Sequence, residues 1–249
     1  MGETILRDTA YVLAALKGST RATDYAERHP TDCPTFGDAI RLHYLMFQAA
    51  EHVDPAGKLG DNAGMPRLAG ENLPDWHGIP RSSGEGVKAE IGRLDNETRL
   101  LTTSKHFTAI DKAAFVNARM MAISPFHGGN AQVAWLMSAE MLIAEGVTKS
   151  VPPAPDKAAY ATALYRAVIH DDVSAMSALL NAATGSQTES PTHEVRFPFR
   201  IQAKNPAVGS LREVEINGMA SAPAAVDIMP GAPIPVSRSV GVVAPYREV

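Results

Sequence analysis

Apolar residues recur along most of the chain at intervals of three and four, the spacing of an amphipathic helix. The clearest example is the series Val87, Ile91, Leu94, Thr98 and Leu101. Related patterns predict further helices over residues 3–16, 35–54, 109–122, 130–145, 156–168 and 173–182. The predicted fold class is therefore mainly α.

Residue types at the ends of these segments support their boundaries. Gly18 is expected to end the first helix, because glycine is the usual residue just past a helix C-terminus. Thr35 has Asp38 three residues later, which is the capping-box spacing. Asn130 is expected to be the N-cap of the helix that follows residues 122–129, because its side chain can accept from free backbone N–H groups.

Two regions depart from the helical pattern. Residues 54–86, DPAGKLGDNAGMPRLAGENLPDWHGIPRSSGEG, are too rich in Gly and Pro to form a long helix and predict a functional flap or an inserted loop. Beyond Gly185, the runs HEVRFPFRI and LREVEI alternate apolar and polar residues, which predicts two short strands. The expected domains are a helical region, 1–185, and a C-terminal β or extended segment, 186–249.

Composition narrows the class of protein. The chain has 249 residues, of which 45% are hydrophobic and 20% charged, as in soluble globular proteins. A net charge of −4 gives no basic surface for nucleic acid or an anionic membrane, so neither partner is expected. The single Cys33 fits a reducing compartment. No signal peptide and no membrane-spanning run is recognised, so a cytoplasmic location is expected. Export as an effector through a signal-independent system would leave no such mark.

The segment AISPFHGGNAQVAW, residues 122–135, interrupts two predicted helices. A break that leads into a helix N-terminus exposes backbone N–H groups and is a natural anion site. The segment contains no Arg, Lys or carboxylate, which usually accompany phosphate or metal. The candidate ligand-binding residues are Phe126, Gly128, Gly129, Asn130, Ala131, Gln132 and Trp135.

This segment resembles the signature of the Fic (Fic/Doc, Fido) family, H-P-F-x-D/E-G-N-G-R-x-x-R. LHYLMFQAAEHVDPAGKLG resembles the family's helix and lead-in to its flap, and YATALYRAVIHDDVSAMSALL resembles the helix pair after the signature. The likeness covers residues 36–182 in the family's order. It implies a Fic-like helical bundle with a short β-hairpin flap within 54–86 and, here, a β-containing C-terminal extension.

The resemblance also implies a chemistry. In the family, the signature His is the general base for a target hydroxyl, the acidic residue holds Mg²⁺, and the Gly-Asn-Gly backbone cradles nucleotide phosphates. The arginines pair with phosphate charge. The typical activity is transfer of AMP, or another phosphate-bearing group, to a protein Ser, Thr or Tyr, in which positioning and charge stabilisation carry the catalysis.

This chain departs from the signature at the positions that carry chemistry. The general base falls on Ser124, a hydroxyl far too weakly basic at neutral pH. The acidic position falls on Gly128, and the two arginines become Gln132 and Trp135. The second glycine becomes Ala131. The residues that match the signature are Pro125, Phe126, Gly129 and Asn130.

Loss of a general base alone costs about 10²–10⁴-fold in rate. The sequence therefore predicts a pseudoenzyme with no catalytic residue and no cofactor. It is expected to act by binding a protein partner through the flap edge or the C-terminal strands. A homo-oligomer is compatible with the sequence.

Two alternatives remain open. The chain could be a divergent transferase that moves a nucleotide or another phosphate-bearing group to protein hydroxyls, with His127 as a surrogate base. ATP and Mg²⁺ would be needed only in that case, and His127 also fits a surface or helix-capping position. Trp135 could stack on a base or fill the core. Alternatively, the match arises by chance in an unrelated helical protein, and 122–135 is then not a helix–break–helix.

Other polar residues have ordinary interpretations. Arg67 and Arg81 are expected to be scattered loop charges, although either could contact a partner. The run His170-Asp171-Asp172 contains metal-ligand residue types, but adjacent side chains in one helical turn diverge. It is expected to be a solvated helix end.

Overall fold

The structure of the chain, a computed structural model, describes residues 2–50, 62–185, 195 and 197–201. Contacts within the chain separate residues 1–213 from residues 214–249, and all described residues fall in the first unit. The domain boundary expected at residue 185 stays a prediction.

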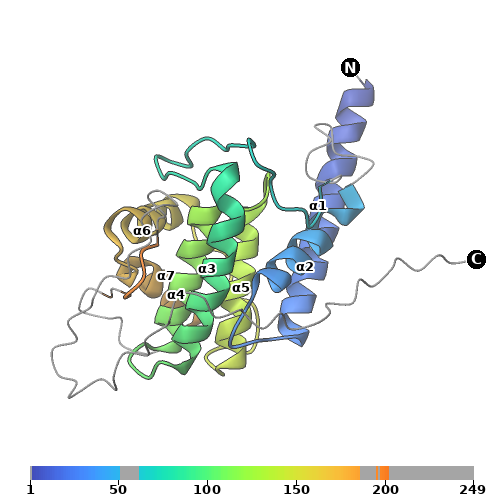
Figure 1. The fold of residues 1–249 in the computed structure, drawn as a ribbon. Helices are drawn as coiled ribbons and strands as arrows, with labels where there is room; N and C mark the ends of the chain where they lie inside the picture. The colour runs from blue at the N-terminus through green and yellow to red at the C-terminus, as the bar shows by residue number, and fades with distance from the viewer. Residues whose placement is uncertain (1, 51–61, 186–194, 196, 202–249) are drawn as a thin grey trace, which may run out of the picture. The chain divides into compact units, whose positions relative to one another are not determined.

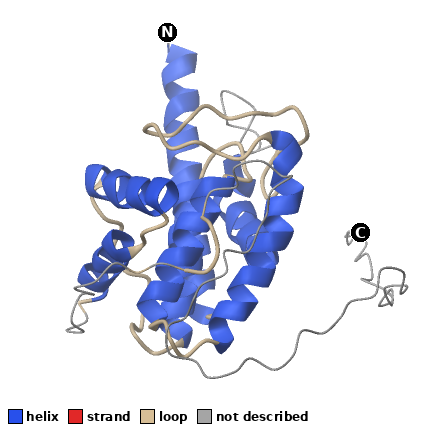
Figure 2. Ribbon diagram, turned by 60° about the vertical axis from the view of Figure 1, so that its left-hand side comes forward, coloured by secondary structure: helices blue, strands red, loops and turns tan. Residues whose placement is uncertain are grey.

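The described part of the chain is helical, as predicted (Figure 1). Its elements are α1 (Gly2–Arg28), α2 (Phe36–Phe47), the 3₁₀ turn η1 (Gln48–Ala50), α3 (Gly84–Thr103), α4 (Ala109–Ile123), α5 (Asn130–Ala144), α6 (Lys157–His170) and α7 (Ser174–Thr184). No strand is drawn among these residues (Figure 2). None of the described helices has the length and apolar character needed to cross a lipid bilayer.

Helix α4 lies at the centre of the bundle. Every residue from Ile110 to Ile123 is buried, because α3, α5, α6 and α7 all pack against this helix. Helix α5 covers one side of α4 and also contacts α1 and α2. The methionines of α4 and α5 fill the core as expected, and the buried ones are Met120, Met121, Met137 and Met141.

Helix α1 continues ten residues beyond Gly18, so the predicted stop at this glycine is wrong. Gly18 instead allows α1 to approach α2 closely. A Cβ at this position would lie 1.8 Å from the carbonyl oxygen of Met46. Glycine is therefore needed for contact between two helices, which a local pattern does not reveal.

The capping box at α2 is confirmed. The backbone N–H and the hydroxyl of Thr35 both donate to Asp38 Oδ2, each at 2.8 Å. Helix α4 begins in the same way, with Thr108 and Asp111 in these roles.

The two β predictions are not confirmed by the described residues. Within residues 62–83 the expected hairpin is a single antiparallel bridge between Trp76 and Ile79. Residues 195 and 197–201 form an irregular segment that docks on the helices. Phe197 stacks on Phe107, in the loop before α4, at 4.1 Å between ring centroids, and meets Phe115 of α4 at 4.9 Å, so this apolar side chain packs on the helical bundle and not on a second strand. The predicted strand LREVEI lies outside the described residues.

A buried ion cluster joins this segment to the bundle. Arg119 of α4 is 1% exposed and donates to Glu90 at 2.5 Å and Glu97 at 2.9 Å, both on α3. It also donates to the carbonyl of Ile201 at 3.0 Å. Burial raises the pKa of Glu97, and the Arg119 charge offsets part of that rise.

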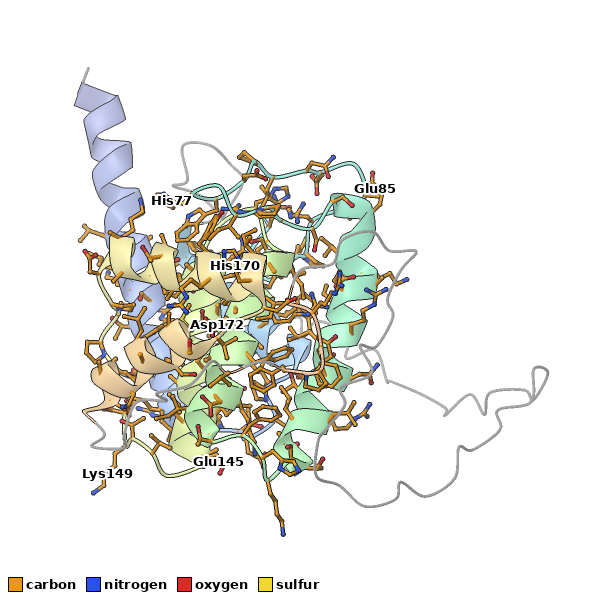
Figure 3. All side chains as sticks on the ribbon, turned by 90° about the vertical axis from the view of Figure 1, so that its left-hand side faces the viewer. His77, Glu85, Glu145, Lys149, His170 and Asp172 are labelled. Atoms are coloured by element: carbon orange, nitrogen blue, oxygen red, sulfur yellow. The ribbon has the colours of Figure 1, made fainter. Side chains whose placement is uncertain are left out.

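The turn between α6 and α7, where Figure 3 labels His170 and Asp172, is only in part the solvated helix end that the sequence suggested, because His170 is exposed and Asp172 is not. Asp172 is 1% exposed and accepts from the backbone and hydroxyl of Ser174 and from Arg166. Burial alone would raise the pKa of Asp172, but these hydrogen bonds lower it. Asp171 accepts from the backbone N–H of Ile201. The carboxylates therefore serve local structure.

Candidate functional site

The break at residues 124–129 joins α4 to α5, so a helix–break–helix is present. Both of its ends have left-handed backbone conformations. Ser124, the C-cap of α4, has φ 45°, and Gly129, the N-cap of α5, has φ 69°. The prediction that Asn130 is the N-cap is wrong, because Gly129 takes that position. A Cβ on Gly129 would lie 2.4 Å from Phe47 Cε2, so close packing also requires glycine there.

The side chain of Asn130 instead forms hydrogen bonds with the backbone of Phe126, within the same loop. Its Oδ1 accepts from the Phe126 backbone N–H at 3.0 Å, and its Nδ2 donates to the Phe126 carbonyl at 2.8 Å. The Phe126 ring is fully buried and stacks on His43, with ring centroids 4.0 Å apart. These contacts hold the loop in one conformation.

His43 of α2 links three segments and was not anticipated from the sequence. Its Nδ1 accepts from the backbone N–H of Gly64, at 2.8 Å. Its Nε2 lies 3.2 Å from the carbonyl of Gly128 and therefore donates to it. This bonding requires the neutral ring. Burial lowers the pKa of His43 to about 4, partly opposed by the bond to Gly128.

Arg67 holds the flap against the end of α4 and is not the scattered loop charge that was expected. It is 3% exposed. Its guanidinium donates to the carbonyls of Ser124 at 2.9 Å, Ile123 at 3.2 Å and Ser82 at 2.9 Å, and also to that of Glu71. Its backbone N–H donates to the Pro125 carbonyl at 2.7 Å. A cation thus neutralises the negative end of α4.

Ser124 lies behind this arrangement. Its side chain is fully buried, and its hydroxyl donates to the Met121 carbonyl at 2.6 Å. The neighbouring His127 contacts the flap. Its Nε2 lies 3.3 Å from Glu71 Oε2, and its side chain is 20% exposed. The position of the family base is therefore closed, and the surrogate histidine stands beside a carboxylate.

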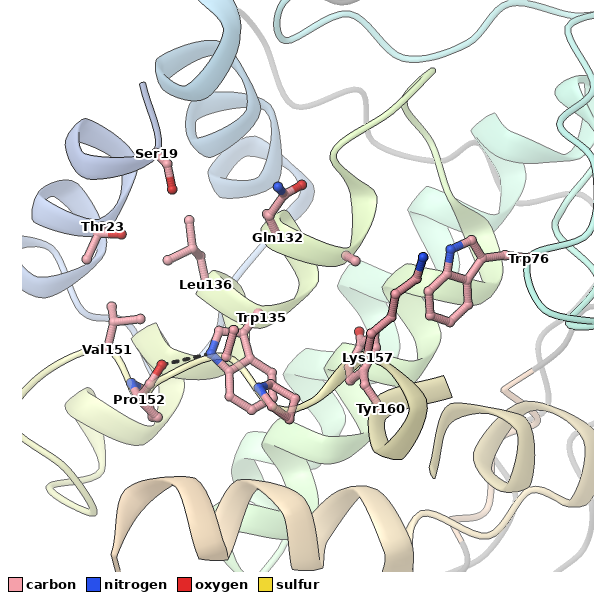
Figure 4. Close-up of a pocket in the computed structure, with 13 residues that line it drawn as sticks. Ser19, Thr23, Trp76, Gln132, Trp135, Leu136, Val151, Pro152, Lys157 and Tyr160 are labelled. Carbon is pink, nitrogen blue, oxygen red and sulfur yellow. Dashed lines mark hydrogen bonds between the residues drawn. The ribbon is translucent and has the colours of Figure 1, made fainter. Parts of the chain in front are cut away.

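The remaining candidate residues line a cavity on the outer side of α5. Ala131, Gln132 and Trp135 face this space of about 540 Å³, together with residues of α1, α6 and the flap (Figure 4). Trp135 is 7% exposed, and its indole N–H donates to the Pro152 carbonyl at 3.0 Å. The structure thus separates the candidates: Phe126, Gly128, Gly129 and Asn130 form the break, and the other three form a cavity wall.

The loop does not fit a magnesium nucleotide. Gly128 has no side-chain oxygen for the metal, and Glu71 beside the loop is engaged with the backbone N–H of Leu68 and with His127. Within the described ranges, no three His, Cys, Asp or Glu side chains group closely enough to hold a metal ion. The residues that face the cavity from α5 carry no positive charge.

This arrangement of helices is the Fic fold. Fic-1 (residues 134–508) from C. elegans matches with a TM-score of 0.52 and 17% identity over 68% of this chain and 47% of that chain. BepC, a VirB-translocated effector from Bartonella tribocorum solved with bound AMPPNP, matches with a TM-score of 0.52 and 15% identity, over 71% and 86% of the two chains. The N-terminal Fic domain of a VirB-translocated Bep effector from Bartonella quintana matches with a TM-score of 0.53 and 15% identity. This match covers 71% of this chain and 82% of that chain.

The match with the C. elegans protein spans about half of that chain. No protein-family model and no curated protein matches the sequence. At identities of 15–17%, the likeness defines the fold and not the activity.

Proposed function

We propose that this chain is a Fic-family pseudoenzyme that has lost AMP transfer and acts by binding another protein. The burial of Ser124 carries the proposal. A general base must reach the proton that it removes, within hydrogen-bond distance or through one water. The Ser124 hydroxyl instead donates its own proton to Met121 and is closed off from solvent.

The charges that phosphate transfer needs are missing from the same loop. BepC was solved with AMPPNP, a nucleotide that carries several negative charges. Here Gly128, Gln132 and Trp135 occupy the positions of the metal ligand and the two phosphate-binding arginines. Without a cation or a metal to neutralise them, phosphates would remain uncompensated.

The flap supplies a surface for a protein partner. Met65 and Leu68 are 58% and 70% exposed on a segment whose backbone Arg67 fixes to the bundle. Apolar side chains held outward on a rigid loop bind at a low entropic cost. The C-terminal strands, the other predicted binding element, lie outside the described residues.

Restoring the signature should not restore activity. The triple variant Ser124→His, Gly128→Glu, Gln132→Arg is expected to transfer less than about 1% as much AMP as an active Fic enzyme, because a general base that cannot reach its proton contributes none of its usual factor of about 10²–10⁴. The imidazole at position 124 would face a packed interior, and Trp135 would still occupy the second arginine position. Transfer of labelled AMP from ATP to protein, followed by mass spectrometry, measures this. AMP transfer by the wild-type chain, or robust transfer by the triple variant, would contradict the proposal.

Partner binding should depend on the flap. We expect Leu68→Asp to reduce recovery of a specific partner by about tenfold or more in quantitative affinity purification, because an exposed apolar side chain that the partner would cover is replaced by a charge. Leu100→Asp is the matched control, since Leu100 is 58% exposed on α3 and away from the flap. Equal recovery with both variants would argue against the flap as the binding surface.

One observation favours a second function, a divergent transferase. His127 Nε2 lies 3.3 Å from Glu71 Oε2, and a carboxylate partner can orient a histidine that acts as a base. If this alternative holds, a nucleotide should raise the Tm of the chain, and His127→Ala should abolish that rise. Lack of stabilisation across a nucleotide panel, with and without Mg²⁺, would eliminate it.

A further inference from the structure

The cavity beside α5 has the size and composition of a small-molecule site. Its volume of about 540 Å³ lies within the range of about 300–1,000 Å³ that is usual for such sites. Helix α1, the first two turns of α5, residues 151–155 and the start of α6 surround it, and Trp76 of the flap closes one end (Figure 4).

Three aromatic rings form much of the wall. Tyr160 meets Trp76 edge to face, with ring centroids 5.9 Å apart, and Trp135 in the same way at 6.3 Å. The polar atoms of two rings are already engaged. The Trp135 N–H donates to Pro152, and the Tyr160 hydroxyl donates to Asn117 Oδ1 at 2.7 Å. These two residues therefore offer the cavity only carbon surface, which suits another flat ring.

A single charge faces this aromatic wall. Lys157 carries the only charge among the described lining residues, and the described ion pairs do not include it. It is the first residue of α6 and follows the N-cap Asp156, whose carboxylate is engaged with the backbone N–H groups of Ala158 and Ala159. In Figure 4 it extends toward Trp76, whereas the hydroxyls of Ser19 and Thr23 lie across the cavity.

We propose that this cavity binds a small planar aromatic molecule that carries one carboxylate. Its ring packs against Trp76, Trp135 and Tyr160, and its carboxylate pairs with Lys157. The hydroxyls of α1 accept from a polar group on the far side of the ring. One ammonium group matches one negative charge, whereas a nucleoside triphosphate would bring several. The inference is independent of AMP transfer and of flap binding, so failure of either leaves it standing.

Isothermal titration calorimetry of the full chain with four probes distinguishes the contributions of the aromatic ring, the carboxylate and the nucleotide. Indole-3-acetate has both features, indole-3-acetamide keeps the ring without the charge, cyclohexylacetate keeps the charge without an aromatic ring, and ATP with Mg²⁺ tests the nucleotide. We expect indole-3-acetate to bind with a Kd of about 0.1–1 mM, as expected for a ligand of this size. The acetamide and the cyclohexyl acid should each bind about fivefold more weakly.

Variants assign the contacts. Lys157→Gln should weaken indole-3-acetate about fivefold and leave indole-3-acetamide unchanged. Lys149→Gln, at an exposed lysine that does not line the cavity, is the matched control and should change neither. Because Lys157 is exposed, its replacement does not disturb the core. Absence of saturable binding by indole-3-acetate up to about ten times the expected Kd would overturn the proposal. An unchanged Kd of indole-3-acetate in Lys157→Gln would also overturn it, as would tighter binding of ATP than of indole-3-acetate.

Discussion

Replacing Arg67 with methionine should lower the free energy of unfolding by about 4 kcal/mol, because four charge-assisted hydrogen bonds are lost together. The methionine preserves much of the apolar stem but leaves the carbonyls of Ile123 and Ser124 buried without their donor. Unpaired carbonyls in a protein interior carry the full cost of desolvation. Urea denaturation measures the loss.

The same variant should release the flap. Arg67 donates to Glu71 and Ser82 within the flap as well as to the end of α4, so its removal disconnects both. We expect faster cleavage of residues 62–83 by thermolysin. Arg81→Met is the matched control, because Arg81 lies in the same segment and its buried Nε has no hydrogen-bond partner. Equal stability losses for the two variants would contradict the role assigned to Arg67.

Glu140 should make the protein less stable as the pH rises. This residue of α5 is fully buried, and neither of its carboxyl oxygens has a hydrogen-bond partner. Burial, with a smaller contribution from the charge of Asp38, raises the pKa of Glu140 from 4.5 to about 8. Between these values the unfolded chain has released the proton that the folded chain retains. The free energy of unfolding therefore falls by about 1.4 kcal/mol per pH unit, or about 5 kcal/mol over the whole interval.

His43 acts in the opposite direction at lower pH. Its pKa falls from 6.5 to about 4 on folding, so between these values the unfolded chain binds a proton that the folded chain does not. Stability gained there as pH rises offsets the loss from Glu140 up to about pH 6.5. From pH 6.5 to 8, Glu140 acts alone, and the expected loss is about 2 kcal/mol.

Denaturant unfolding at several pH values between 6.5 and 8 tests this prediction. Glu140→Gln should abolish the decline, because the amide does not titrate. Glu145→Gln, at the exposed C-cap of the same helix, should leave the decline unchanged. A decline that persists in Glu140→Gln would assign it to another group.

The helical architecture was predictable because its signals are local. Apolar periodicity located α3 to α7 within a few residues, and the Thr35–Asp38 spacing identified the start of α2, although α2 ends at Phe47 and not at residue 54. The break between α4 and α5 was also evident from its composition. The order of the segments that resemble the Fic signature and its flanks indicated the fold, which the solved structures confirm.

What the sequence did not reveal depends on contacts between distant segments. Gly18 has the local pattern of a helix end, and nothing in the nearby sequence indicates its close contact with Met46. Arg67 has the local pattern of a loop charge, because its carbonyl partners at Ile123 and Ser124 lie more than fifty residues away in the sequence. Glu140 gave no signal at all, since a carboxylate in an apolar helix pattern does not show whether it finds a partner.

The aromatic wall of the cavity has an optical consequence. The chain contains two tryptophans, Trp76 and Trp135, and both line this one space. Trp135 is shielded from water while Trp76 is only partly covered, so their emission should differ in wavelength. The tryptophan fluorescence of the protein thus arises at the walls of the cavity. A ligand that enters the cavity should therefore change the tryptophan emission of the unlabelled protein.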